Sequence, residues 1–305
     1  MSGGVDSSVA ALLLKKEGYD VSGVTMCLGI ATDDSAKCCG ASALDDAKRV
    51  CDRLQIPHYV FDYASQLEKK VIAHFISEYQ KGRTPNPCVE CNRHLKFGTL
   101  LDKALSLAFD FLATGHYAAI GKNENGYFLA RPKDKKKDQT YFLYSIPYQR
   151  LGDILFPLAR FTKEEVRDLA KEYSLPVAAK QESQDICFVT QKNSQEFLSE
   201  RVRECKPGPI VDLHGKLLGR HRGIIFHTIG QRAGLGISHP TPLYVLSIDS
   251  GRNLIVVGEK KDLMANGLVA SDVNILAENW PKEVHAKIRY RKKDALCRVT
   301  KEKDK

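Results

Sequence analysis

The first residues of the chain combine glycines, an acid and hydroxyls directly ahead of an apolar run. Gly3 and Gly4 can adopt backbone angles closed to other residues, and Asp6, Ser7 and Ser8 are good helix starters. The N–H groups of a helix start, the positive end of its dipole and the hydroxyls together make a site for a polyanion. The stretch therefore predicts a turn that binds phosphate or pyrophosphate, with an ordinary glycine turn before a capped helix as the alternative.

A second group of reactive residue types lies in GRTPNPCVECNRHLKFG, residues 82–98. Cys88 and Cys91 form a C-x-x-C motif among cations that would lower the pKa of a thiol: Arg83, Arg93, His94 and Lys96. The prolines predict an irregular loop here rather than a helix. Cys187 follows near the end of the same region and is placed to reach the same cleft. A structural zinc knuckle, with Cys38 and Cys39 as further ligands, is the alternative interpretation.

The elements that would position these residues alternate along the first half of the chain. Apolar periodicity predicts helices and short β-branched runs predict strands. The expected strands are 21–30, 58–63 and 110–120, and the expected helices are 42–54, 66–82 and 97–108. This alternation predicts an α/β domain with a doubly wound parallel sheet, whose ligands lie at the carboxyl ends of the strands.

The second half of the chain has a different pattern of residue types. Thr162 and Glu165 are spaced as a capping box, so a helix is expected to begin there. From about Lys206, short runs cut by Gly, Pro and Asp predict a small β domain, with a hairpin turn at 249–253 and a basic strand pair at 283–299. We expect three domains: a catalytic domain at 1–204, a central β domain at 205–265 and the start of a β-barrel at 266–305.

Length and composition narrow the class of protein. The 305 residues contain no run of about 18 apolar residues and no basic-then-apolar leader, so we expect no membrane partner and a cytoplasmic location. The odd count of nine cysteines argues against a secreted disulfide framework. The net charge of +9 favours an anionic partner such as nucleic acid.

The motifs also resemble a known family. SGGVDSS resembles the pyrophosphate loop (PP-loop) of ATP pyrophosphatases, which adenylate carbonyl oxygens. Together with the C-x-x-C stretch, ATGHYA, KDQTYFL, SQDICF, HTIGQRAGLGI and IRY, the chain resembles the bacterial tRNA-specific 2-thiouridylases over essentially all its residues. The resemblance implies ATP and Mg²⁺, a tRNA with a wobble uridine, and a sulfur donor such as a cysteine desulfurase or sulfur carrier. It also implies a strand before Met1 and a longer C-terminal barrel, so we expect a piece of a longer protein.

The resemblance assigns roles to individual residues. The catalytic residues would be Cys187, Cys91 and Asp6: Cys187 would carry the sulfur as a persulfide, Cys91 would be the partner thiol that forms a disulfide with it, and Asp6 would act in the phosphate loop. The implied ATP-binding residues are Ser2, Gly3, Gly4, Val5, Asp6, Ser7, Met26 and Gly115. The target base would lie against Asn86, Pro87 and Cys88. The implied tRNA contacts are His116, Lys137, Asp138, Gln139, Arg289 and Tyr290.

One residue departs from the family pattern and keeps an alternative open. Many members have aspartate where this chain has Cys88. Cys88, Cys91 and Cys187 would then suit three irons of a [4Fe–4S] cluster whose fourth iron binds the transferred sulfur. Two other classes also remain open: an ATP pyrophosphatase that uses an amine nucleophile, such as a tRNA lysidine synthetase, and an RNA-binding module with structural zinc.

Overall fold

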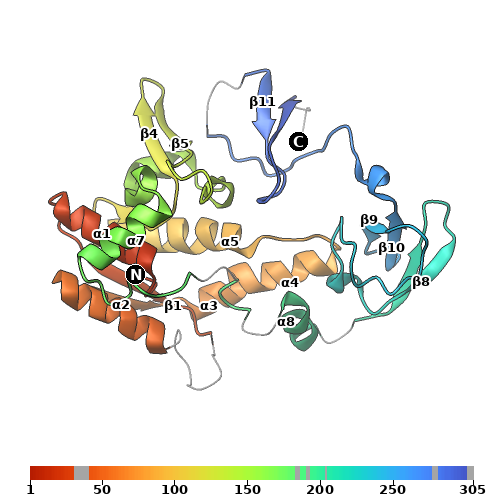
Figure 1. Cartoon of the computed structure of the whole chain (residues 1–305), viewed down its shortest axis with the longest axis horizontal. Coiled ribbons are helices and arrows are strands. Elements are labelled where there is room, and N and C mark those ends of the chain that lie inside the picture. The colour runs from red at the N-terminus through yellow and green to blue at the C-terminus, as the bar shows by residue number, and fades with distance from the viewer. Residues whose placement is uncertain (31–40, 183–185, 190–192, 203–204, 277–280, 301–305) are drawn as a thin grey trace. The chain divides into compact units, whose positions relative to one another are not determined.

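The computed structural model describes residues 1–30, 41–182, 186–189, 193–202, 205–276 and 281–300. The chain divides into two compact units. Unit 1 contains Met1–Leu67, Cys88–Gln184 and Ala270–Lys305, and unit 2 contains Glu68–Pro87 and Asp185–Val269 (Figure 1). The three-domain division drawn from the sequence stays a prediction.

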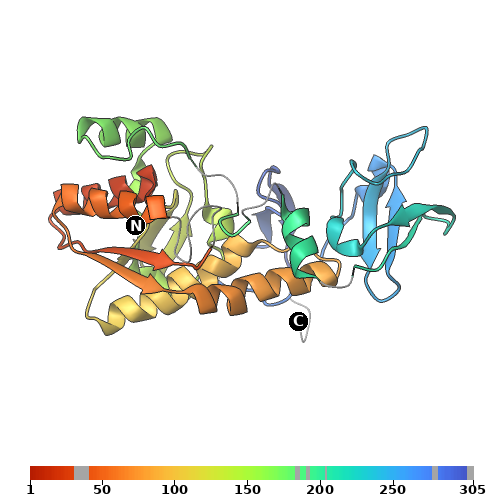
Figure 2. The ribbon, with the colours of Figure 1, turned by 90° about the horizontal axis from the view of Figure 1, so that it is seen from below.

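Unit 1 is built on parallel strand pairs. Strand β1 (Gly23–Cys27) pairs in parallel with β2 (His58–Asp62), and β3 (Leu112–Ala113) pairs in parallel with β6 (Ile154–Leu155). Figure 2 shows α1 (Val5–Lys16) and α2 (Ala41–Leu54) on one side of β1 and β2 and the helical segments that follow Cys91 on the other. The α/β class with parallel strands is therefore confirmed.

Helix α1 is the central helix of this unit. Eight of its twelve residues are buried, and its apolar side chains pack with those of α2 and α7 (Lys163–Glu172). A helix that is apolar on nearly all sides is stable only inside a core. The first turn of α1, and with it the glycine motif directly ahead of Val5, is thereby fixed in place.

The C-x-x-C stretch folds differently from the expected loop. Helical segments run without interruption from Pro87 to Ser106: α5 (Pro87–Glu90), η2 (Cys91–Leu100) and α6 (Leu101–Ser106). Proline is well suited to the first position of a helix, because the N–H that it lacks has no intrahelical partner there. The prediction of an irregular loop was wrong from Pro87 onward.

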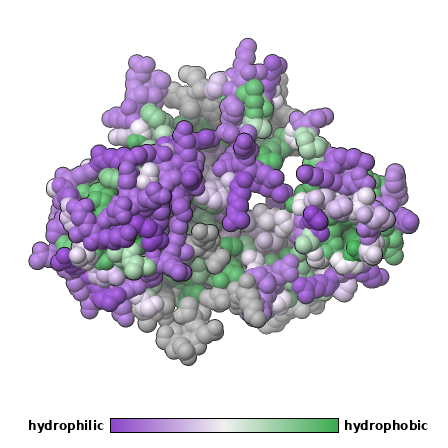
Figure 3. All heavy atoms as spheres, viewed as in Figure 1, coloured by the Kyte–Doolittle hydropathy of each residue, from purple (hydrophilic) through white to green (hydrophobic). Residues whose placement is uncertain are grey.

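The remaining elements of unit 1 are short. The antiparallel hairpin β4 (Ala119–Asn123) and β5 (Gly126–Ala130) was not predicted, whereas the basic pair β11 (Glu283–Ala286) and β12 (Ala295–Arg298) is confirmed as antiparallel. Short helices complete the unit: η3 (Thr140–Phe142), η4 (Tyr148–Asp153), η5 (Pro157–Arg160) and the four-residue α3 (Ala64–Leu67). In Figure 3, hydrophilic residues cover most of the visible face over α1 and α7, and apolar residues gather near β11.

Unit 2 contains a four-stranded sheet in the order β8-β7-β10-β9. Its strands are β7 (Gly208–Val211), β8 (Leu217–His221), β9 (Tyr244–Asp249) and β10 (Leu254–Gly258). The turn between β9 and β10 is the predicted hairpin. The helices are η1 (Glu68–Ile72), α4 (Ala73–Gln80), α8 (Ser194–Arg201), η6 (Ile224–Phe226) and η7 (Lys260–Leu263). Among the described helices, none is long and apolar enough to cross a membrane.

Two buried histidines of unit 2 predict a loss of stability in acid. His221 and His227 are 3% and 5% exposed, their ring centroids are 5.9 Å apart, and burial lowers the pKa of both, that of His227 to about 4. Between pH 6.5 and 4 the unfolded chain therefore binds a proton at position 227 that the folded chain excludes. Stability is fully retained above pH 6.5 and falls by about 3 kcal/mol as the pH drops through this range.

Urea unfolding at pH 7.5 and 4.5 measures this loss. His227→Gln, which removes the titrating group, is expected to lessen the difference between the two pH values. The exposed His214 supplies a matched control, since His214→Gln should leave the difference unchanged. Equal acid sensitivity in His227→Gln and the unsubstituted protein would contradict the prediction.

Candidate functional site

The glycine turn at the start of α1 forms a closed loop. Gly3 has φ +67°, in the left-handed region that favours glycine, and Gly4 is the N-cap of α1. The hydroxyls of Ser7 and Ser8 donate to the Gly4 carbonyl at 3.2 and 2.8 Å, and the Ser2 N–H donates to Ser7 Oγ at 3.2 Å. The first N–H groups of α1 have no intrahelical partner, so they are directed at whatever anion the loop holds.

Two glycines of the predicted nucleotide site are required by close packing. A Cβ on Gly3 would lie 2.3 Å from the Ala43 carbonyl oxygen. A Cβ on Gly115, just after β3, would lie 2.7 to 2.9 Å from backbone atoms of Asp6 and Ser7. Gly115 thus lies directly against the loop.

The other two predicted nucleotide contacts occupy different environments. Val5 is the first residue of α1 and is 5% exposed, so its side chain belongs to the core and only its backbone faces the loop. Met26 is half-buried on β1, near the carboxyl end of that strand. That end is where ligands of parallel sheets lie.

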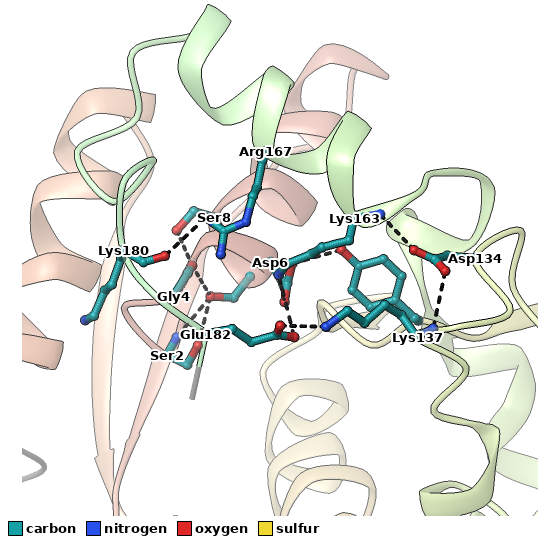
Figure 4. Close-up of polar contacts among 12 residues, drawn as sticks. Ser2, Gly4, Asp6, Ser8, Asp134, Lys137, Lys163, Arg167, Lys180 and Glu182 are labelled. Atoms are coloured by element: carbon teal, nitrogen blue, oxygen red, sulfur yellow. Dashed lines mark hydrogen bonds and ion pairs between the residues drawn. The ribbon is translucent and has the colours of Figure 1, made fainter. Parts of the chain in front are cut away.

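Asp6 carries an ion pair that the sequence did not predict. Lys163 Nζ, from the first residue of α7, donates to both carboxylate oxygens at 2.6 and 2.7 Å, and the Tyr117 hydroxyl donates to one of them at 3.0 Å (Figure 4). The Lys163 side chain is only 12% exposed. Burial, and secondarily the Asp6 charge, raise the pKa of Tyr117, so the phenol stays protonated and donates.

A second lysine holds the turn itself. Lys180 Nζ donates to the Gly3 carbonyl at 2.9 Å and to Asp46 Oδ2 at 2.6 Å. This contact, followed by that of Arg49, lowers the pKa of Asp46. Lys180 therefore fixes a positive charge beside the turn, although it lies 177 positions from Gly3 and 134 positions from Asp46 along the chain.

The predicted tRNA segment Lys137–Gln139 is connected to the same loop. Gln139 Oε1 accepts from the Tyr117 N–H at 2.9 Å, and the Gln139 N–H donates to the Tyr117 carbonyl at 2.9 Å. Lys137 pairs with Glu182 at 2.6 Å, and Glu182 lies 3.9 Å from Lys163 (Figure 4). Tyr117 thus joins a segment expected to contact tRNA to the acid of the phosphate loop.

The second predicted tRNA segment lies beside the first within unit 1. The ring of Tyr290 packs on that of Phe142 with centroids 4.6 Å apart, and the neighbouring Arg289 is exposed. Arg131 bridges the segments, with ion pairs to Asp138 at 3.6 Å and to Asp294 at 2.9 Å. A cavity of about 400 Å³ lies here, lined by Arg131, Asp138, Thr140, Tyr141, Tyr144 and Lys287.

His116 lies between aromatic rings. Its centroid is 5.9 Å from that of Phe97 and 6.0 Å from that of Phe156, and its Nδ1 is 2.7 Å from Thr114 Oγ1. Burial, and secondarily the charge of Lys96, lower the pKa of this imidazole well below its usual value. A contact of His116 with RNA would therefore use a neutral ring.

The two cysteines of the C-x-x-C motif lie one helical turn apart. Cys88 is exposed, whereas Cys91 is 8% exposed. Burial raises the pKa of the Cys91 thiol and outweighs the opposing charge of Lys96. The expectation that neighbouring cations lower the pKa was wrong for Cys91, because removal from water has the larger effect on this buried thiol.

Three further predicted residues, Asn86, Pro87 and Cys187, fall in unit 2. Asn86 and Pro87 end its first segment, and Cys187 is exposed in the segment 186–189. Cys38 and Cys39 lie outside the described residues. Over the described ranges, no three His, Cys, Asp or Glu side chains gather as a metal site requires.

These features define a class before any comparison. A glycine loop at the start of a buried helix, beside parallel strands and fixed cations, is an anion site of the kind that nucleotide-binding α/β domains share. A family model described as the tRNA methyl transferase HUP domain matches residues 1–191, and one described as the tRNA methyl transferase PRC-barrel domain matches residues 195–259.

Curated relatives identify the family. The chain is 56% identical to tRNA-specific 2-thiouridylase MnmA 1 of Syntrophus aciditrophicus, over 100% of this chain and 82% of that protein. It is 47% identical to tRNA-specific 2-thiouridylase MnmA of Acetivibrio thermocellus, over 97% and 85%. The chain belongs to the tRNA-specific 2-thiouridylase family, as the motifs predicted.

Among solved structures, a predicted subunit of tRNA methyltransferase from Methanocaldococcus jannaschii is 22% identical to the chain. The match covers 56% of this chain and 72% of that one, with a TM-score of 0.37. A likeness this distant adds nothing to the assignment.

Proposed function

We propose that this protein is an ATP-dependent tRNA-uridine 2-sulfurtransferase. It adenylates O2 of the wobble uridine and replaces that oxygen with sulfur, which releases AMP and pyrophosphate. The observation that carries the proposal is the phosphate loop at Asp6, with Lys163 and Gly115 packed against it, in a chain of this family. Transfer of a methyl group requires neither a pyrophosphate loop nor paired thiols.

Adenylation answers a chemical problem of the substrate. An oxygen on a pyrimidine ring is a poor leaving group, and attachment of AMP converts it into a good one. The N–H groups at the start of α1 and the charge of Lys180 stabilise the negative charge that develops on the leaving pyrophosphate. The Asp6 carboxylate and the Ser7 hydroxyl are hard oxygen ligands that suit Mg²⁺, which neutralises phosphate charge when bound.

Sulfur transfer then requires two thiols. The terminal sulfur of a Cys187 persulfide attacks C2, the C2–O bond breaks, and AMP leaves with its electron pair. The Cys91 thiolate next attacks Cys187 Sγ, which releases the thiolated base and forms a Cys91–Cys187 disulfide. An external reductant and a sulfur donor reset the pair. Asn86, Pro87 and Cys88 contact the uridine after it leaves the anticodon stack, while Arg289, Tyr290, His116 and Lys137–Gln139 hold the surrounding tRNA.

The persulfide route predicts activity without iron. It needs only two thiols, whereas a [4Fe–4S] cluster needs Cys88, Cys91 and Cys187 around one centre. Protein purified without oxygen is expected to be colourless, to contain no iron and still to thiolate tRNA. About four irons per chain, with activity that disappears on chelation, would establish the cluster instead.

Mass spectrometry of digested tRNA tests the proposed function. The protein is incubated with ATP, Mg²⁺, a cysteine desulfurase with cysteine, and unmodified tRNA, and 2-thiouridine is expected at the wobble position. Omission of ATP should prevent its formation. A methylated uridine, or a lysine-modified base, would overturn the proposal.

A further inference from the structure

Lys163 contacts the phosphate loop from the start of α7, which is distant from the loop along the chain. It is the first residue of α7, whose start is fixed by the capping box in which the Glu165 N–H donates to Thr162 Oγ1 at 3.3 Å and the Thr162 N–H to Glu165 Oε2 at 2.6 Å. Its backbone N–H also donates to Asp134 Oδ2 at 3.0 Å. The backbone is therefore fixed, while the four-carbon side chain remains able to change partner.

The present partner of Lys163 is a group that the reaction needs. Both oxygens of Asp6 accept from its ammonium, at 2.6 and 2.7 Å. The same carboxylate is the acidic ligand that the loop offers to Mg²⁺, and a cation on those oxygens competes with the ammonium for them. A Mg²⁺ ion bound with the nucleotide would therefore compete with Lys163 for the Asp6 oxygens.

The Lys163 side chain is only 12% exposed. If its ammonium left Asp6, it would need another anion, because an unpaired buried charge is costly. Among the described residues, a second carboxylate lies within ion-pair distance of Lys163 Nζ, that of Glu182 at 3.9 Å, and it is already paired with Lys137 at 2.6 Å. Asp6 is the second residue of α1, so the phosphate groups held at the start of α1 would lie close to Nζ. Lysine is a common point-charge ligand of phosphates.

We propose that Lys163 is a phosphate-binding residue that moves from Asp6 to the β- and γ-phosphates of ATP and stabilises the departing pyrophosphate. In that step the bond from uridine O2 to the α-phosphorus forms, the bond from this phosphorus to the bridging oxygen breaks, and the electron pair leaves with pyrophosphate. Lys163 neutralises the charge so gained. The inference rests on the proposed function and extends it to a residue that the motifs did not indicate.

Calorimetric titration of Lys163→Met tests the contact itself. We expect affinity for pyrophosphate and for α,β-methylene ATP, both with Mg²⁺, to fall about tenfold, and affinity for AMP to change less than twofold. Lys171→Met is the matched control, because Lys171 lies on the same helix with its side chain 68% exposed. Unchanged pyrophosphate affinity would overturn the inference, as would equal losses for AMP and pyrophosphate, which indicate a general disturbance of the site.

Binding without metal tests the change of partner. In Asp6→Asn, Lys163 loses its carboxylate, so we expect pyrophosphate to bind several-fold more tightly in EDTA than it binds the unsubstituted protein. Most of that gain should vanish in Asp6→Asn combined with Lys163→Met. A gain of equal size in the double variant would show that Asp6 acts only by repulsion and would overturn the exchange.

The binding measurements distinguish failure of the proposed function from failure of the phosphate-binding role of Lys163. Unsubstituted protein that binds neither ATP analogue nor pyrophosphate would overturn the proposed function and this inference together. Tight binding that Lys163→Met leaves unchanged would overturn this inference alone.

Discussion

Replacement of Cys187 by serine is expected to abolish 2-thiouridine formation, by at least about 1,000-fold, while ATP cleavage continues. Serine cannot carry a persulfide, whereas the loop that activates uridine O2 contains no cysteine. Two measurements on the same reaction check this result: mass spectrometry of the nucleosides, and release of pyrophosphate during the first turnover. Cys297→Ser, on the half-exposed β12, is the matched control and should retain both activities.

Cys91→Ser should fail at a later step. Without the second thiol, the bond between Cys187 Sγ and the transferred sulfur is not broken, so tRNA stays covalently attached to the protein. We expect a protein–tRNA adduct on a denaturing gel that a reducing agent releases. Normal 2-thiouridine yield in Cys187→Ser would contradict the persulfide route, and absence of the adduct in Cys91→Ser would contradict the role of its thiol.

The parts of the fold that the sequence predicted depend on local pattern. The capping box at Thr162 predicted the start of α7, and apolar spacing predicted α2 and the strands on either side of it. The hairpin of β4 and β5 was missed although it has a local signal. Asn125–Gly126 is a turn dipeptide, and Gly126 has φ +105° in the structure.

The parts of the site that were missed depend on contacts between distant residues. Lys163 and Asp6 are 157 positions apart, and Lys180 and Gly3 are 177 positions apart. Neither lysine lies in a motif of its own, so a single sequence gives no signal that pairs them with the loop. Lys163 had only the indirect signal of the capping box, which placed it at the first position of a helix.

The thiols show why charge patterns along the chain are weak guides to pKa. Cations flank Cys88 and Cys91 in sequence, yet Arg93 pairs with Asp272 at 2.8 Å and His94 lies 3.2 Å from Glu90. Of those cations, Lys96 is the one that lowers the pKa of the buried Cys91, and desolvation exceeds its effect. In the folded protein, two of the cations that flank the motif in sequence therefore lie against carboxylates instead of acting on the thiols.

Gly115→Ala is expected to lower kcat/KM for ATP by about 100-fold. The new Cβ would lie 2.7 Å from the Asp6 carbonyl carbon and 2.8 Å from the Ser7 nitrogen, and these backbone atoms cannot move aside without displacing the start of α1. A displacement of about 1 Å in a group that positions a reacting phosphate costs a factor of this size. Overpacking is also expected to reduce stability by about 1 to 3 kcal/mol.

Gly267→Ala isolates this steric effect. A Cβ at Gly267 meets no atom within 4 Å, so the same substitution should leave activity and unfolding unchanged there. Steady-state kinetics with varied ATP and urea unfolding of both variants provide the comparison. An unchanged dependence of the rate on ATP in Gly115→Ala would contradict the prediction. It would show that the close packing of Gly115 does not hold the loop in its phosphate-binding form. If Gly115→Ala lost activity with unchanged unfolding, the close approach of Gly115 to Asp6 and Ser7 would serve the reaction rather than the stability of unit 1.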